Sequence, residues 1–231
     1  MSVKEGKDYL YLIWKCEKNR RQYIVGQLTR NGQYEFQYCG EIEDALKSGF
    51  KKLISFEDLN QIYVSRELFP VFSSRLPDRK RKDIDKILEK YGLKEYDSYE
   101  LLKRSGAKLP IDNIHFIDPI LNFEEAFEKE FYLAGPRYYL DCKGEFCIKE
   151  TRVTRGDEIF LEHEKGNLYD SNAVCVKDVS GRLLGYVPRY YSKAILRFME
   201  ENRVKGCHIL NVDMQKGCDE CISIILQVSE V

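Results

Sequence analysis

Two cysteines, Cys218 and Cys221 in GCDEC, have the spacing of metal ligands. Such a pair could supply half of a tetrahedral zinc site, which usually needs a second pair or a Cys/His set. Distant partners could come from Cys142, Cys147, Cys207 and His208. The eight cysteines otherwise lie in apolar, strand-like runs rather than at the spacings of a disulfide framework, so we expect reduced, buried thiols and no metal.

Catalytic motifs are missing from the sequence. It contains neither a glycine-rich phosphate loop followed by Lys-Ser/Thr nor an HExxH motif. None of the three histidines, His115, His163 and His208, is paired in sequence with a plausible nucleophile. The HEKGN segment that begins at His163 lacks the second histidine of a zinc-hydrolase helix and is typical of a strand end. We therefore expect a protein that is not an enzyme and uses no cofactor.

Aromatic and acidic groups crowd the segment NLYDSNAVCVKDVSGRLLGYVPR, which begins at Asn167. Tyr169 and Asp170 precede an apolar run from Ala173 to Val176 that is typical of a core strand, and Ser180-Gly181 indicates the following turn. This arrangement would leave Tyr169 and Asp170 at the edge of a hairpin, facing a ligand.

Charge and hydropathy limit the classes of partner. Lys and Arg number 37 against 38 Asp and Glu, a formal net charge of -1, so no large basic field drives nonspecific binding to nucleic acid and any such contact must be local. No apolar run approaches the ~20 residues of a membrane span, and MSVKEGKDYLYLIWK lacks the apolar core of a secretory signal. We expect a cytoplasmic, globular protein that does not bind a membrane.

The first half of the chain has the pattern of an α+β domain over residues 1–120. Strand composition at 8–16, 21–30 and 33–39 predicts a β-meander, with a two-residue turn at Asn31-Gly32. Capping and periodicity predict three helices, at 41–48, 78–91 and 98–105, and strand composition returns at 112–120.

The second half has strand signals roughly every ten residues, typical of a small barrel or sandwich over residues 130–231. A linker at 121–129, within a helical turn that extends to Glu130, joins the halves. Strands are expected at 131–140, 145–153, 158–164, 173–179, 183–188 and 221–231. One amphipathic helix is expected at 189–202, where Tyr191, Ala194, Ile195, Phe198 and Met199 recur at helical spacing.

The order GPRYY, GDEIFLEHE, NLYDSNAVCV and GRLLGYVPR followed by a helix closely resembles the HIRAN domain over about residues 130–228. This resemblance implies a small OB-like β-barrel that binds single-stranded DNA with a free 3′ end. Such a site needs stacking faces for bases, donors for one or two phosphates and an acceptor for the terminal hydroxyl.

The resemblance assigns stacking and phosphate roles to one short segment and the hairpin edge. Tyr138, Tyr139 and Tyr169 would supply stacking faces, and Arg137 would hold a phosphate in a forked pair of hydrogen bonds. The alternatives are tyrosines that simply occupy strand edges and a solvated surface arginine.

The remaining candidates lie in the hairpin and after it. Asp170 would accept from a terminal hydroxyl and repel a phosphate, but it could equally cap the turn, an alternative that applies more strongly to Asn172. Gly185 would let the backbone approach the ligand beside Tyr186, where some family members carry histidine. Arg189 matches a phosphate-contacting position, and a phosphate would explain a cation at a helix start.

The first half resembles the N-terminal subdomain of HipA-type persistence kinases, through VGQLTRNGQYEFQY, LFPVFSSRLPDRKRKD and LLKRSGAKLPIDNIHF. No kinase domain follows, so the resemblance implies a protein-interaction module that can act as an antitoxin. One stretch could face nucleic acid or an acidic partner, or be a solvated face; its cations are Arg75, Arg79, Lys80, Arg81, Lys82 and Lys86.

Together these patterns predict a non-catalytic protein that binds single-stranded DNA at a free 3′-hydroxyl end through its second half. The alternative is an antitoxin-like or regulatory partner of a HipA-type kinase in which the barrel is a scaffold. A weaker alternative is a nuclease or DNA-repair subunit whose active residues the sequence does not reveal.

Overall fold

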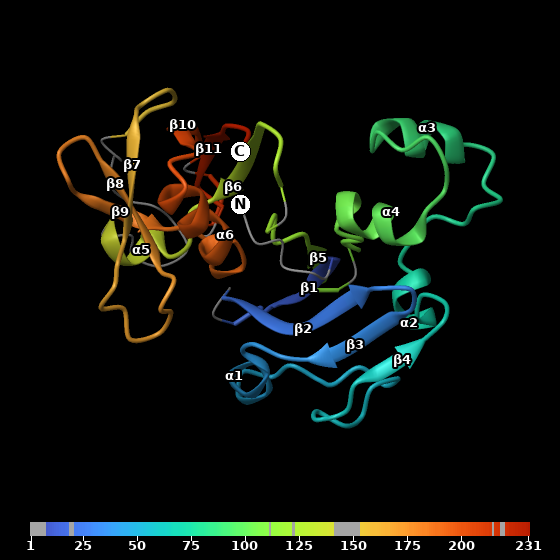
Figure 1. Ribbon diagram of the computed structural model, residues 1–231. Helices are drawn as coiled ribbons and strands as arrows, with labels where there is room; N and C mark the ends of the chain where they lie inside the picture. Colours follow the sequence, from blue (N-terminus) through green and yellow to red (C-terminus); the bar gives the residue numbers. More distant parts are fainter. Residues whose placement is uncertain are drawn as a thin grey trace. The chain divides into compact units, whose positions relative to one another are not determined.

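A computed structural model describes residues 8–18, 21–110, 112–121, 123–140, 153–213, 215–217 and 220–231 (Figure 1). The chain divides into two compact units between Pro119 and Ile120. Both units combine sheets with short helices, so the predicted α+β class is confirmed. None of the helices in the described ranges could cross a membrane.

The first unit is built on one five-stranded antiparallel sheet with the order β4-β3-β2-β1-β5. Its strands are β1 (Asp8–Lys15), β2 (Gln22–Arg30), β3 (Tyr34–Tyr38), β4 (Tyr63–Ser65) and β5 (Ile114–Ile117). The predicted meander of three strands and the returning strand are therefore confirmed.

The turn between β2 and β3 differs from its prediction by one residue. Arg30 pairs with Tyr34, so three residues connect the strands rather than two. Gly32 has φ +74°, a conformation that glycine adopts without a steric cost, and the Asn31 N–H donates to the Gln33 carbonyl at 3.0 Å. The glycine was predicted correctly and the loop length was not.

The described residues of the first unit form four helices: α1 (Ile42–Lys47), α2 (Pro70–Ser73), α3 (Ile84–Lys90) and α4 (Ser98–Ser105). The prediction for α4 is confirmed in detail, because Asp97 accepts hydrogen bonds from the N–H groups of Tyr99 and Glu100.

The helix predicted from Asp78 begins only at Ile84. Asp78 instead closes a local turn by accepting from the Lys80 N–H at 2.7 Å, so its cap-like character belongs to that turn. Arg81 is bound to Asp83 just before α3 begins. The polar run at 78–83 therefore has a turn conformation, and the helix is restricted to the apolar-periodic part.

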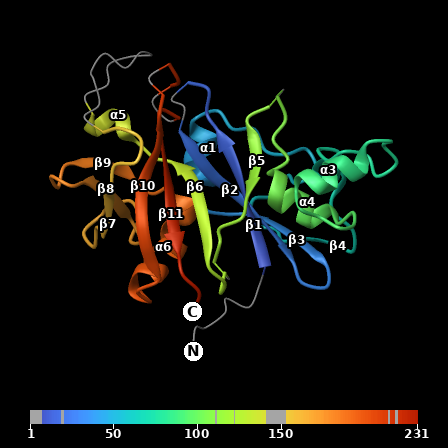
Figure 2. The same ribbon diagram turned by 90° about the horizontal axis from the view of Figure 1, so that it is seen from above.

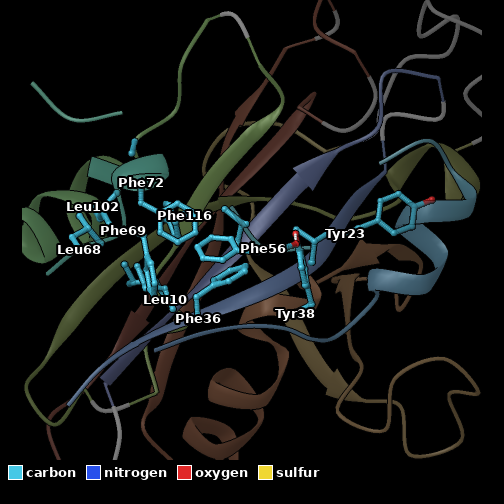
Figure 3. Packing of buried hydrophobic residues seen from close by; sticks show 14 of the residues in the cluster. Leu10, Tyr23, Phe36, Tyr38, Phe56, Leu68, Phe69, Phe72, Leu102 and Phe116 are labelled. Atoms are coloured by element: carbon cyan, nitrogen blue, oxygen red, sulfur yellow. Dashed lines mark hydrogen bonds between the residues drawn. The ribbon is translucent and has the colours of Figure 1, made fainter. Parts of the chain in front are cut away.

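Aromatic rings dominate the core of the first unit, as Figure 3 shows. Phe36 lies with its ring centroid 4.3 Å from that of Phe56 and 5.2 Å from that of Phe72. Phe72 in turn meets Phe116 edge to face at 5.0 Å. These rings come from β3, the 50s loop, α2 and β5, so one cluster joins segments far apart in the sequence.

The second unit contains two three-stranded sheets among the described residues (Figure 2). One has the order β10-β11-β6, formed by β10 (Val204–Val212), β11 (Ile222–Val228) and β6 (Phe127–Tyr132). The residues before β6 were expected to be a linker with a helical turn up to Glu130, but the segment from Phe127 pairs with β11 as a strand.

Two arginines hold the segment before β6 on the second unit. Arg203, which is buried, donates to the carbonyl groups of Phe123 and Glu124 and to that of Ser229. Arg197 donates to the Leu121 carbonyl. The described residues at 121–124 are therefore anchored by charge-assisted hydrogen bonds to this unit.

The other sheet has the order β7-β8-β9, formed by β7 (Ile159–His163), β8 (Val174–Asp178) and β9 (Leu183–Tyr186). Isolated bridges, Ala134 with Tyr186 and Glu158 with His208, join segments of the unit. The strand predicted at 145–153 lies almost wholly outside the described residues. The described sheets do not close, so the OB-like barrel stays a prediction.

Helices α5 (Pro136–Tyr139) and α6 (Arg189–Glu200) complete the second unit. The α6 prediction is confirmed, because its apolar face is buried at Tyr191, Ala194, Ile195 and Phe198. The α5 turn falls where a strand was expected at 131–140. Gly135, with φ +67°, ends the extended segment, and Pro136 occupies the first helical position.

Candidate nucleic-acid interface

Asn167 shapes the turn that carries Tyr169 and Asp170. Its side-chain oxygen accepts from the N–H of Tyr169 at 2.9 Å and from that of Asp170 at 3.0 Å. This Asx turn places Tyr169 in solvent, and the residue is 84% exposed. The neighbouring Leu168 is exposed as well. Two large side chains on a rigid turn form a surface that a flat ligand could cover.

Asp170 caps the turn, as its structural alternative predicted. Its Oδ1 accepts from the Asn172 N–H at 2.9 Å, and its backbone carbonyl accepts from the Ala173 N–H at 3.0 Å. The predicted contact of Asp170 with a terminal hydroxyl is compatible with this cap, because a carboxylate has a second oxygen. Asn172 contributes its backbone N–H to the turn, and a ligand role for its side chain stays a prediction.

Glu164, just after β7, connects this turn to β9. Its Oε2 accepts from Asn167 Nδ2 at 2.6 Å and from the Tyr186 hydroxyl at 2.9 Å. The hydrogen bonds from Asn167 and Tyr186 lower the pKa of Glu164, and burial together with the bond to Glu164 raises the pKa of Tyr186. The carboxylate is therefore charged and the phenol protonated near neutral pH.

Helix α5 presents the other predicted group of aromatic residues. Tyr138 is 70% exposed and Tyr139 is 39% exposed. The Arg137 guanidinium donates to the Tyr138 hydroxyl at 2.8 Å and lies 4.8 Å from its ring centroid. The Tyr139 ring lies 5.6 Å from that of Tyr186, which brings α5 to the Glu164 network.

Gly185 is buried, and its lack of a side chain has a packing reason. A Cβ at this position would lie 2.9 Å from the Ala134 carbonyl oxygen and 3.4 Å from the Leu133 Cβ. The segment leading into α5 therefore passes directly over β9, where Ala134 and Tyr186 exchange backbone hydrogen bonds. The close approach predicted for a ligand is used here by the protein's own backbone.

Arg189 is the first residue of α6 and is exposed. Its Nη2 donates to the Tyr169 carbonyl at 2.9 Å, so the cation at the helix start helps to hold the aromatic turn. This contact offers an explanation for its position that requires no phosphate. A phosphate contact by Arg189 stays a prediction.

Hydrogen bonds and ring contacts thus link candidates from three separate segments. A path runs from Tyr139 through Tyr186, Glu164 and Asn167 to the turn, which Arg189 holds from α6. The sequence did not identify Glu164 or Asn167 as site residues. Glu164 was predicted to lie at a strand end, and Asn167 only began the crowded segment. The signal available for both was their spacing of three residues around Lys165-Gly166, typical of a turn.

The structure tests the prediction about zinc only in part, because Cys218 lies outside the described residues. Within the described ranges, no group of three or more His, Cys, Asp or Glu side chains could hold a metal ion. Four of the cysteines described there are free thiols: Cys16, Cys39, Cys175 and Cys207. Burial raises the pKa of Cys207 to about 12 and that of Cys39 to about 11, which makes both thiols unreactive.

Arg75, one of the basic residues before α3, is not available to a ligand. Only 8% of its side chain is exposed, and it binds the Asp112 carboxylate and the carbonyl groups of Ala107 and Ile114. Arg81 is paired with Asp83 on the surface. The predicted basic face is therefore smaller than the sequence indicated. Apart from the paired Arg81, its exposed cations are Arg79, Lys80, Lys82 and Lys86.

Comparison with known families assigns a domain to each half. Residues 127–228 match the family model described as the HIRAN domain, and residues 20–110 match that described as the HipA N-terminal domain. Both resemblances found in the sequence are thereby confirmed. Among curated proteins, no sequence matches.

Three solved structures match part of the chain. The crystal structure of the HIRAN domain of human HLTF is 18% identical, with 46% of this chain and 78% of that chain covered and a TM-score of 0.31. A crystal structure from Lactobacillus plantarum, target LpR91B, is 19% identical, with 45% and 98% covered and a TM-score of 0.31. The NMR structure of the HLTF HIRAN domain in its DNA-bound conformation is 19% identical, with 46% and 73% covered and a TM-score of 0.28.

Proposed function

Because residues 127–228 match the HIRAN domain and residues 20–110 the HipA N-terminal domain, we propose that this protein binds the free 3′-hydroxyl end of single-stranded DNA through its second unit and a protein partner through its first. It does so without catalysis. The free thiols of Cys16, Cys39, Cys175 and Cys207 favour a reducing compartment such as the cytoplasm.

The observation that carries the proposal is the linkage of exposed rings from separate segments. Tyr169 and Tyr138 expose most of their surface, and Tyr139 is tied to Tyr169 through Tyr186, Glu164 and Asn167. Unpaired bases present flat π-faces that stack on such rings, each contributing about 1–3 kcal/mol. Paired bases in a duplex are already stacked and have no free faces to offer.

The charges at the site support an end rather than the middle of a strand. Asp170 and Glu164 place two carboxylates in the same hydrogen-bonded network, where they would repel phosphate and accept from a hydroxyl. Arg137 and Arg189 supply cations for one or two phosphates further along the strand. So few phosphate contacts predict a shallow dependence of affinity on salt concentration.

Titration of labelled strands tests this proposal. The full chain should bind a single strand with a 3′-hydroxyl more tightly than the same strand with a 3′-phosphate, and a blunt duplex least. Asp170→Ala should remove the preference for the hydroxyl, with thermal unfolding as the check that the variant is folded. Equal weak binding of the wild type to all three DNAs would exclude the end-binding function.

A second function, regulation of a HipA-type kinase in the manner of an antitoxin, is favoured by the match at residues 20–110. Sedimentation of the full chain mixed with a purified HipA-type kinase tests it. A stable complex that forms equally well without DNA would support a regulatory role in toxin–antitoxin function. Retention of the complex only in the presence of a single strand would instead favour a role in DNA repair.

A further inference from the structure

Glu164 occupies a branch point between the two parts of the candidate interface. Both of its hydrogen bonds, from Asn167 Nδ2 and from the Tyr186 hydroxyl, end on the same oxygen, Oε2. Across the part of the chain that the structure describes, its other oxygen, Oε1, accepts no hydrogen bond. Oε2 therefore connects the turn to β9, and Oε1 can still accept a hydrogen bond.

The organising bonds reach both groups of aromatic residues. Through Asn167, Glu164 fixes the backbone N–H groups of Tyr169 and Asp170. Through Tyr186, it fixes the ring against which Tyr139 lies. Loss of these bonds would release two elements that are remote in sequence, since Tyr186 belongs to β9 and the turn follows β7.

Its charge has no ion-pair partner of its own among the described residues. The nearby Lys177 donates instead to Glu162, at 2.6 Å, on the preceding strand. Because two hydrogen bonds stabilise the ionised form, the Glu164 carboxylate keeps its negative charge down to a lower pH than an ordinary glutamate. Lys177 adds a smaller electrostatic stabilisation of this carboxylate without pairing with it directly. A carboxylate that makes no direct ion pair still repels a phosphate placed beside it.

We propose that Glu164 is both the positioning residue of this interface and a determinant of its selectivity, holding Tyr186 and the 167–170 turn through Oε2 while its charge and Oε1 favour a hydroxyl terminus over a phosphate. The inference rests on the proposed function. It adds a second carboxylate to the selectivity that Asp170 alone was predicted to supply.

Glu164→Gln separates charge from positioning. A glutamine carbonyl oxygen can still accept from Asn167 and Tyr186, so the fold and the binding of the 3′-hydroxyl strand should be retained. The preference for a 3′-hydroxyl over a 3′-phosphate should fall about five- to tenfold, the size expected when one charge is removed several ångströms from a phosphate in a partly solvated site. Competition titrations of the full chain with the two strands measure this ratio.

Two further variants complete the test. Glu162→Gln makes the same charge change two residues earlier in the chain, within β7, at a carboxylate engaged by Lys177, and should leave the ratio within about twofold of wild type. Glu164→Asp keeps the charge with a shorter reach, so it should retain the ratio while weakening the binding of all strands. It also keeps the test informative if Glu164→Gln does not fold.

The outcomes are distinguishable. A loss of preference in Glu164→Gln, with the preference retained in Glu162→Gln and Glu164→Asp, supports the inference. An unchanged ratio in Glu164→Gln, or equal losses in both glutamine variants, overturns it while the proposed end binding stands. A wild-type protein that binds neither strand overturns the proposed function, and this inference with it.

Discussion

The two units use the same residue types in opposite ways. In the first unit, Tyr99 is fully buried, and the guanidinium of Arg30 lies 4.4 Å from its ring centroid while donating to Asp97 and Glu100. In the second unit, the equivalent pair lies on a single turn of helix, where Tyr138 is exposed and Arg137 is half-buried. Arginine and tyrosine stabilise a fold where packing encloses them and are available to a ligand where it does not.

The carboxylates differ between the units in the same sense. Asp97 and Asp112 are each bound by an arginine, and these contacts lower their pKa values against the effect of burial. Glu164 is held only by neutral donors. The first unit thus pairs these carboxylates with its own arginines, whereas the second unit holds Glu164 without a direct ion pair beside exposed tyrosine rings. Substitutions in either unit can test this difference.

The largest effect is expected in the aromatic core of the first unit. Phe36→Ala should destabilise that unit by about 4 kcal/mol, because it removes buried surface and leaves a cavity among Phe56 and Phe72. Hydrogen exchange, resolved to each unit, measures the change. Phe160→Ala, at an exposed ring of the second unit, is the control and should change little. Comparable losses in both would contradict the difference between the units.

A smaller loss is expected when a partly buried ion pair of the first unit is broken. Arg75→Ala should cost about 3 kcal/mol, because it leaves Asp112 and the Ile114 carbonyl without their donor. The matched control is Arg81→Ala, which removes an exposed pair with Asp83 and should change the stability far less. Urea unfolding followed by fluorescence compares them. Equal costs would show that Arg75 does not carry the proposed structural role.

Tyr169→Ala should act on binding and not on stability. We expect a loss of about 2 kcal/mol in affinity for every single strand, regardless of its end, because a stacking face is removed. The melting temperature should stay unchanged, since the ring is exposed. Phe160→Ala is again the control and should bind as wild type does. If Tyr169→Ala binds normally, the turn is not part of the interface.

The smallest effect concerns pH and the first unit. Burial lowers the pKa of His115 to about 4 from its ordinary 6.5. The unfolded chain therefore takes up a proton that the folded one does not, and stability falls as the pH drops below 6.5. Between pH 6.5 and about 5 the loss should be about 1–2 kcal/mol. Urea unfolding at both pH values measures it, and His115→Gln should abolish most of the difference.

Local patterns predicted much of the fold from the sequence. Strands β1, β2, β3 and β5 of the first sheet and helices α4 and α6 follow from alternation, caps and helical spacing, whereas β4 was not predicted. The sequence prediction failed at the strand from Phe127, because its pairing with β11, a tertiary contact, selects the extended conformation. It also failed at α5, where the turn at Gly135 ends the extended segment locally. The helix expected from Asp78 was shortened because a turn satisfies that carboxylate locally.

The candidate interface was predicted as a set of residue types but not as a connected network. Tyr169 and Asp170 were recognisable from their composition and family pattern. Glu164 and Asn167 were not, because their importance comes from hydrogen bonds between β7, β9 and the turn, which no local pattern encodes. Gly185 was recognised for its backbone, but the absence of a side chain there makes room for the protein's own chain, because a Cβ would lie 2.9 Å from the Ala134 carbonyl oxygen.

Binding to linear and circular single strands of the same sequence tests the central claim most directly. If the second unit recognises a strand end, one molecule should bind each linear strand whatever its length, and a covalently closed circle should compete poorly. Sedimentation with labelled strands of several lengths gives both the stoichiometry and the affinity. A stoichiometry that rises with strand length, together with equal affinity for the circle, would contradict the account.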